Sequence, residues 1–145
     1  MSEENVELVV GTLRGPDVNL AEIARDDEMF AAMMQEIGSA FRADIQFDNH
    51  GFPAGDVTCV GLDAVRSLFR DWYQPWETYR TEVEQAIDCG ERVLLLTRDL
   101  GVLWGTAQEV TLNLGCVYTI RDGKIARWEV YLDRSEALKA VGLEG

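Results

Sequence analysis

The sequence has few of the residues that form metal sites or disulfides. It has one histidine and three cysteines, and the cysteines are widely spaced, without a CxxC pair. An odd number of isolated cysteines is typical of reduced thiols, so we expect a cytoplasmic protein without structural disulfides. One histidine and no cysteine cluster predict no zinc site, and nothing in the sequence implies another metal or an organic cofactor.

Positive charge and long apolar runs are also scarce. The chain has 13 Lys and Arg against 26 Asp and Glu, a formal net charge of −13, and no basic run. Phosphate backbones and anionic membranes attract basic surfaces, so we expect neither a nucleic acid nor a membrane as a partner. No apolar run approaches the roughly 18 residues of a membrane helix, and the first residues lack the pattern of a secretory signal.

What the sequence does contain is enough chain for one domain, 1–145, in which helices precede strands. Helical spacing of apolar residues predicts helices in 3–14, 20–37 (one or two) and 62–73. Alternating polarity predicts strands in 41–48 and 79–88. Further strands are expected in 92–104, 108–121 and 124–132, the last two joined by a hairpin turn at Asp122-Gly123. Residues 49–60 look irregular, and a short helix follows Asp133. This order predicts the α+β class.

Several segments resemble known proteins. Residues 117–133 (VYTIRDGKIARWEVYLD) resemble the nuclear-transport-factor-2-like (NTF2-like) superfamily. Residues 4–9, 59–69 and 131–138 are similar to its SnoaL-like, polyketide-cyclase-like branch. The resemblance implies a cone: a strongly bent mixed or antiparallel sheet wrapped around N-terminal helices, with an apolar pocket on the concave side. It also implies a homodimer, and functions that range from isomerases, cyclases, dehydratases and epoxide hydrolases to binding alone.

Strand parity predicts the pocket walls. Arg121 is expected to pair with Lys124 across the hairpin turn, which fixes the register of the two strands. The resulting pairs are Val117 with Trp128, Gly115 with Val130, and Asn113 with Leu132. We therefore expect the ligand-binding residues to include Asn113, Val117, Trp128 and Val130, together with Trp72 and Tyr79. An apolar wall with a tryptophan suits a small apolar or cyclic ligand.

The resemblance also identifies a missing catalytic group. In epoxide hydrolases and polyketide cyclases of this superfamily, the catalytic aspartate follows the hairpin glycine by seven residues, and that position is Val130 here. Asp99 falls near the general acid of the epoxide hydrolases, but Thr97 stands where those enzymes need an arginine. Arg98 has the wrong parity unless a bulge intervenes. Asp99 and Arg98 could equally form a surface ion pair.

Asp48 is a second candidate catalytic residue. It lies in a segment that resembles the ketosteroid isomerases, in which an aspartate at this point shuttles protons. Gln46 and His50 share its parity, so the three could line one edge of the pocket, where apolar surroundings would raise the pKa of the carboxyl. Alternatively, residues 48–51 form a polar turn.

Three functions follow from these patterns. The first is binding of a flat or cyclic apolar molecule, and the second is acid–base catalysis by Asp48 with His50 or Asp99. The third is an association module whose pocket is filled by its own side chains, Met33, Met34 and Phe69. A carboxyl with an abnormal pKa inside a cavity would favour the enzyme.

Overall fold

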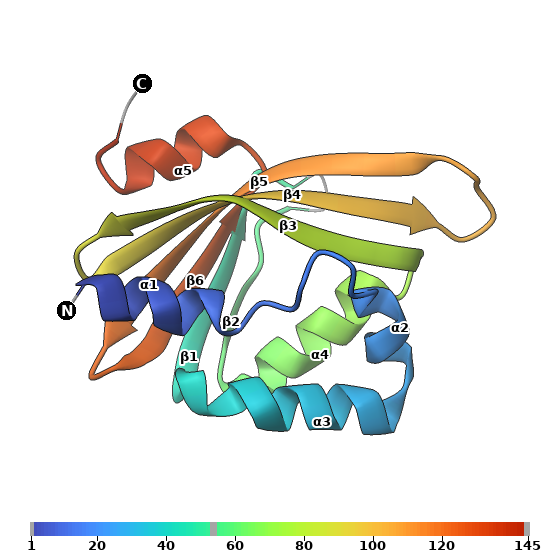
Figure 1. The fold of residues 1–145 in the computed structure, drawn as a ribbon, viewed down its shortest axis with the longest axis horizontal. Helices are drawn as coiled ribbons and strands as arrows, with labels where there is room; N and C mark the ends of the chain where they lie inside the picture. Colours follow the sequence, from blue (N-terminus) through green and yellow to red (C-terminus); the bar gives the residue numbers. More distant parts are fainter. Residues whose placement is uncertain (1, 53–54, 144–145) are drawn as a thin grey trace.

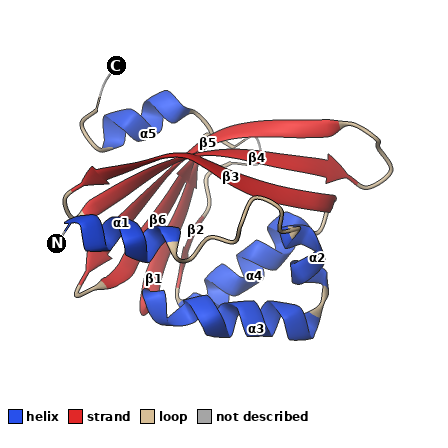
Figure 2. Cartoon of the chain, viewed as in Figure 1, coloured by secondary structure: helices blue, strands red, loops and turns tan. Residues whose placement is uncertain are grey.

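The computed structural model describes residues 2–52 and 55–143 of the chain. Its helices are α1 (Ser2–Val10), α2 (Leu20–Arg25), α3 (Asp27–Ile37), α4 (Leu62–Tyr73) and α5 (Arg134–Ala140), with a short 3-10 helix, η1 (Gly38–Ala40). Its strands are β1 (Phe41–His50), β2 (Thr58–Val60), β3 (Trp76–Cys89), β4 (Arg92–Leu103), β5 (Glu109–Arg121) and β6 (Lys124–Tyr131). Figures 1 and 2 show this order, which confirms the predicted α+β class.

The strands form one open, curved sheet in the order β2-β1-β6-β5-β4-β3. Strands β1 and β6 run parallel, and every other neighbouring pair is antiparallel, so the sheet is mixed. The β5–β6 hairpin turns at Asp122 (φ 54°) and Gly123 (φ 75°). Two successive positive φ angles are typical of the tight turn that fits the twist of a hairpin, as the Asp-Gly pair predicted.

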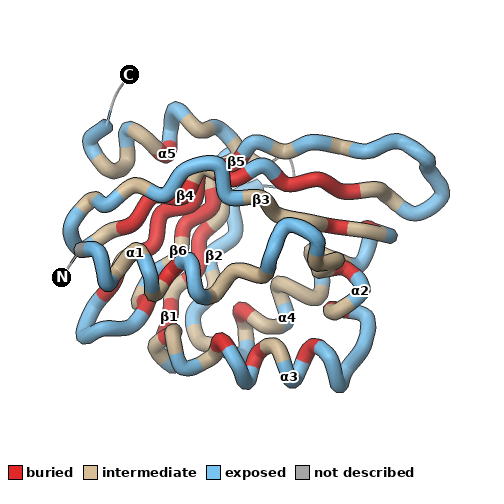
Figure 3. Tube along the Cα trace, viewed as in Figure 1, coloured by how far each residue is buried: buried red, intermediate tan, exposed pale blue. Residues whose placement is uncertain are grey.

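Helices cover both faces of the sheet. Helices α1 to α4 lie on the concave face and α5 lies on the other (Figure 1). Helix α3 buries Phe30, Met34 and Ile37, which share one face because of their helical spacing. On the other face, Gly115 of β5 lies under Ala137 of α5, and a Cβ atom on Gly115 would come within 2.4 Å of the Ala137 Cβ. Buried residues therefore follow the middle of the sheet and the inward helix faces (Figure 3).

The structure decides one local point that the prediction left open and corrects another. The 20–37 segment divides into two helices at Asp26, whose side chain accepts hydrogen bonds from Glu28 N and Met29 N and so caps α3. The 49–60 segment, expected to be irregular, contains β2, which pairs with β1 through Gln46, Phe47 and Asp48. Residues 53 and 54 of that segment lie outside the described residues.

Candidate active site

A cavity of about 180 Å³ lies between the concave face of the sheet and the helices. Its walls come from α3, α4 and the segment after α1 on one side, and from β1, β3, β4, β5 and β6 on the other. Most of the lining side chains are aliphatic or aromatic. The two charged ones among the described residues are Arg14 and Asp99. Because the cavity remains beside Met33 and Phe69, these side chains do not fill it.

Trp128 forms the centre of an aromatic wall. Its ring stacks on Tyr118 at 5.3 Å, and it meets Phe69 edge-on at 4.9 Å and Phe47 at 5.3 Å. Packing on several sides holds the indole in one orientation. Cys116 also lines the cavity, and burial followed by the charge of Asp99 raises the pKa of its thiol to about 12. This thiol therefore stays protonated.

Asp99 brings a carboxyl group to this apolar cavity from strand β4. The residue is only 6% exposed. Its Oδ2 accepts a hydrogen bond from the Tyr79 hydroxyl at 2.6 Å, and its Oδ1 accepts none from the described residues. Burial raises the pKa of Asp99 to about 6, although the nearby hydroxyls of Tyr79, Thr97 and Thr81 oppose the rise. Near neutral pH, this carboxyl can both release and take up a proton.

Tyr79 is fixed beside Asp99 by its backbone and its ring. Its N–H donates to the Oδ1 of Asn19, the residue that also caps α2. Its ring packs against Trp76 at 5.2 Å and Tyr73 at 5.3 Å. Burial, and then the charge of Asp99, raise the pKa of Tyr79 far above its usual range, so the phenol stays protonated and donates to the carboxyl.

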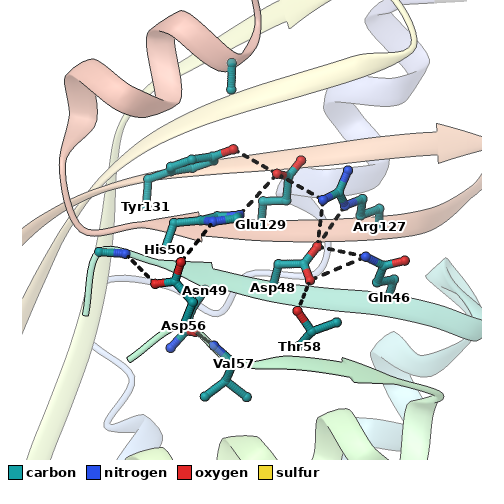
Figure 4. Close-up of polar contacts among 12 residues, drawn as sticks. Gln46, Asp48, Asn49, His50, Asp56, Val57, Thr58, Arg127, Glu129 and Tyr131 are labelled. Carbon is teal, nitrogen blue, oxygen red and sulfur yellow. Dashed lines mark hydrogen bonds and ion pairs between the residues drawn. The ribbon is translucent and has the colours of Figure 1, made fainter. Parts of the chain in front are cut away.

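A second polar cluster lies on the outer face of the sheet (Figure 4). Asp48 is 4% exposed; its Oδ2 accepts from Arg127 Nε at 2.9 Å, and its Oδ1 accepts from the Thr58 hydroxyl at 2.7 Å. Glu129 accepts from the Tyr131 hydroxyl at 2.8 Å and lies 3.3 Å from His50 Nε2. Burial favours a higher pKa for Asp48, but hydrogen bonds from Thr58, Arg127 and Gln46 outweigh it and lower the pKa. The cluster is therefore an ion-pair network on the sheet.

The same cluster has the residue types of a metal site. Ligand atoms of Asp48, His50 and Glu129 lie within 4.8 Å of one another, the one such group in residues 2–52 and 55–143. Arg127 already lies between the two carboxylates, 2.8 Å from Asp48 and 3.5 Å from Glu129. A cation bound there would have to displace that guanidinium, so we assign the charges to the ion-pair network.

Comparison with known proteins agrees with the fold. The model of the SnoaL-like domain matches residues 20–128, which is most of the chain. The chain belongs to the SnoaL-like domain family. A comparison with curated proteins finds no match.

Solved structures share the fold of this SnoaL-like domain at low sequence identity. One is a protein of Jannaschia sp. CCS1 that is described as a SnoaL-like polyketide cyclase. It is 14% identical with a TM-score of 0.69, and the match covers 99% of this chain and 94% of that one. TerC, co-crystallised with polyporic acid, is 20% identical with a TM-score of 0.66, over 95% and 98%. An epoxide hydrolase of M. tuberculosis that resembles limonene epoxide hydrolase is 19% identical with a TM-score of 0.62, over 96% and 90%. These likenesses show the NTF2-like fold.

The register predicted for the β5–β6 hairpin is wrong by one residue. Arg121 pairs with Lys124 as expected, but a bulge between Thr119 and Ile120 shifts the pairs beyond it. The observed pairs are Tyr118 with Trp128, Val117 with Glu129, Cys116 with Val130, and Gly115 with Tyr131. A bulge inserts one extra residue and so exchanges the faces of all the residues that follow.

The SnoaL-like domain brings five of the ten predicted site residues to the cavity. These are Trp72, Tyr79, Asp99, Trp128 and Val130. Val117 instead packs on the outer face with Leu94 and Ala137, and Asn113 lies in an outer groove near α5. Gln46, Asp48 and His50 also lie on the outer face, since alternation along β1 turns Phe47 and Asn49 toward the cavity. The prediction that these three line the pocket is corrected accordingly.

The prediction from the sequence did not include several residues that line the cavity. Tyr118 and Cys116 were not predicted to line the cavity, because the predicted register without a bulge puts Val117 and Gly115 on that face instead. Thr97 shares the parity of Asp99 and could have been found from it. Arg14 gave no signal: it fell at the end of the predicted helix 3–14, whereas α1 ends at Val10, and helical spacing does not indicate that a polar residue lines a cavity.

Among the described residues, no helix is both long and apolar enough to span a membrane.

Proposed function

We propose that this SnoaL-like domain binds a small, largely apolar ring compound in its cavity and catalyses a proton transfer on it without a cofactor. Asp99 is the general acid–base of this proposal. The observation that carries it is a carboxyl that lines an apolar cavity, has a pKa of about 6 and is hydrogen-bonded at only one of its oxygens. A buried carboxyl with a shifted pKa is common at catalytic sites.

The size of the cavity supports a ligand of one or two rings. An engineered apolar cavity of about 150 Å³ binds benzene, and this one measures about 180 Å³. Its wall of Trp128, Phe47 and Phe69 offers ring faces and edges against which a flat molecule stacks.

A single acid–base group favours isomerisation or carbanion-type cyclisation over hydrolysis. Hydrolysis needs one group to activate water and another to protonate the leaving oxygen, and the position of the usual second carboxylate is Val130. One carboxylate can do both halves of a proton shift. It takes a proton from a carbon next to a carbonyl group, leaving an enolate, and returns that proton to another carbon of the same ligand. Tyr79 holds the carboxylate in place during both steps.

Exchange of deuterium into a ketone tests the proposal without knowledge of the natural substrate. β-Tetralone in deuterium oxide should lose its α-proton NMR signals faster in the presence of the protein. Asp99→Asn should reduce this acceleration at least about 100-fold. The rate should rise with pH through about 6, because the ionised carboxylate is the base.

Asp71→Asn is the matched control, since it makes the same chemical change at an exposed position of α4. It should leave the exchange rate unchanged. Equal rates in the wild type and Asp99→Asn would contradict the role of Asp99.

Binding without catalysis is the second candidate, favoured by the valine at the usual base position. It predicts that β-tetralone binds the wild type and Asp99→Asn alike, and that neither accelerates the exchange. Measuring both the binding of β-tetralone and its deuterium exchange therefore separates the two candidates.

The resemblance to the superfamily also supports a homodimer. Sedimentation should give twice the 16.3 kDa mass of the chain, and the mass of a single chain would contradict this part of the proposal.

A further inference from the structure

Arg14 is the one cationic residue that lines the cavity within the described part of the chain. It lies in the segment between α1 and α2, and its side chain is only 21% exposed. A guanidinium stays charged at every physiological pH. A permanent positive charge therefore borders a cavity whose other walls are mostly apolar.

Two of the three nitrogen atoms of the Arg14 guanidinium have partners among the described residues. Nη2 donates to the carbonyl of Gly11 at 3.2 Å, and Nη1 lies 3.1 Å from Glu36 Oε2. Nε is buried, and no described residue accepts a hydrogen bond from it. Because Nη2 carries a second N–H, Nε and Nη2 together form the side-on fork that matches the two oxygens of a carboxylate.

We propose that the ligand carries a carboxylate, and that Arg14 binds it. This inference rests on the proposed function and narrows its substrate class to ring compounds of one or two rings with an acidic substituent. A buried donor without a partner is unfavourable, and a carboxylate oxygen of the ligand would supply the missing acceptor.

The charges around Arg14 agree with this assignment. Glu36 is 69% exposed, and an ion pair with an exposed partner contributes little and is easily exchanged. The chain as a whole has a net charge of −13 and repels anions, so an anionic ligand needs a local cation. The other charged residue of the cavity, Asp99, would repel a carboxylate when ionised. The ligand therefore lies with its acidic group at Arg14 and its reacting carbon at Asp99.

Matched acids and amides test the inference. α-Naphthoate and α-naphthamide have nearly the same shape and differ in charge, as do benzoate and benzamide. Their binding can be followed by quenching of tryptophan fluorescence, since Trp72 and Trp128 line the cavity. The wild type should bind at least one acid about tenfold more tightly than its amide, and Arg14→Gln should remove that preference while leaving amide affinity within about twofold.

Two other variants keep the test decisive. Arg121→Gln removes an exposed cation from the β5–β6 hairpin and should leave the preference intact. Glu36→Gln frees Arg14 from its anionic partner and should strengthen acid binding about two- to threefold, even if Arg14→Gln proves unstable.

The inference is overturned if the wild type does not prefer either acid over its amide, or if Arg14→Gln preserves the preference. The exchange of β-tetralone tests the proposed function independently of this inference, because that ketone has no acidic group to bind Arg14. A wild type that shows no Arg14-dependent acid preference but normal Asp99-dependent exchange refutes the carboxylate assignment alone. Absent exchange with an Arg14-dependent preference refutes the catalytic proposal alone.

Discussion

The buried carboxyl of Asp99 destabilises the folded chain at neutral pH. Raising its pKa from 3.8 to about 6 corresponds to roughly 3 kcal/mol against the ionised folded state. The stability associated with this carboxyl is complete below its unfolded pKa, near 4, and is lost as the pH rises through about 6. Such a cost is expected where a group is kept for its chemistry.

Asp99→Asn should therefore stabilise the protein at neutral pH. Urea unfolding at about pH 7.5 should give a gain of about 1 to 2 kcal/mol, since the amide removes the charge but adds an N–H group that needs a partner. The gain should shrink as the pH falls from about 6 toward 4. A gain independent of pH would show that the carboxyl is not titrating in this range.

Asp48, by contrast, contributes to stability and not to the cavity. Arg127→Gln removes the guanidinium that holds this buried carboxylate. We expect the free energy of unfolding to fall by about 1 to 3 kcal/mol. The loss is smaller than for a fully buried pair because the Arg127 side chain is 44% exposed. Because the folded pKa of Asp48 is lowered, its stabilising effect is present above about pH 4 and is lost below it.

Urea unfolding of Arg127→Gln beside Arg121→Gln measures this loss, and the exchange of β-tetralone should be unaffected. A catalytic defect with normal stability would instead return Asp48 to the list of active-site candidates. The sequence already held the relevant evidence. The alternation that puts Phe47 on the core face of β1 puts Asp48 on the other.

At the scale of elements, the order of helices and strands could be predicted because each carries its own period. The alternation in 41–48 and the Asp122-Gly123 turn needed no tertiary information. The β5–β6 bulge could not be placed so directly, although Ile125 and Trp128 are apolar at a spacing of three, which breaks the period of two. The one extra residue of this bulge decided which residues of β5 line the cavity.

The packing of α5 on the sheet depends on Gly115. A Cβ atom there would overlap Ala137, which is fully buried. Gly115→Ala should therefore destabilise the protein by about 1 to 3 kcal/mol. In a double-mutant cycle measured by urea unfolding, Ala137→Gly should recover part of the loss, whereas Thr111→Ala, at an exposed position of the same strand, should cost much less. Strictly additive effects at positions 115 and 137 would show that α5 does not rest on this glycine.

At the scale of the whole molecule, the cone was predictable from the resemblance but the contents of its cavity were not. The cavity lies where side chains from all four helices of the concave face or their connecting segments meet five strands. Its volume and its polar groups depend on how those elements are placed, and local periodicity carries no such information. Arg14 is the clearest case, because only the fold brings it to the same cavity as Asp99.

The net charge of −13 acts on the molecule as a whole. Folding brings the acidic side chains closer together than in the expanded unfolded chain, so their repulsion opposes the folded state. Salt shortens the range of that repulsion, from about 30 Å at 0.01 M to about 10 Å at 0.1 M. Raising the sodium chloride concentration from about 0.01 M to about 0.5 M should therefore raise the melting temperature by a few degrees. The Asp71→Asn/Glu77→Gln double variant, which loses two exposed charges, should respond less steeply, and a melting temperature independent of salt would mean that the local ion pairs already balance the excess charge.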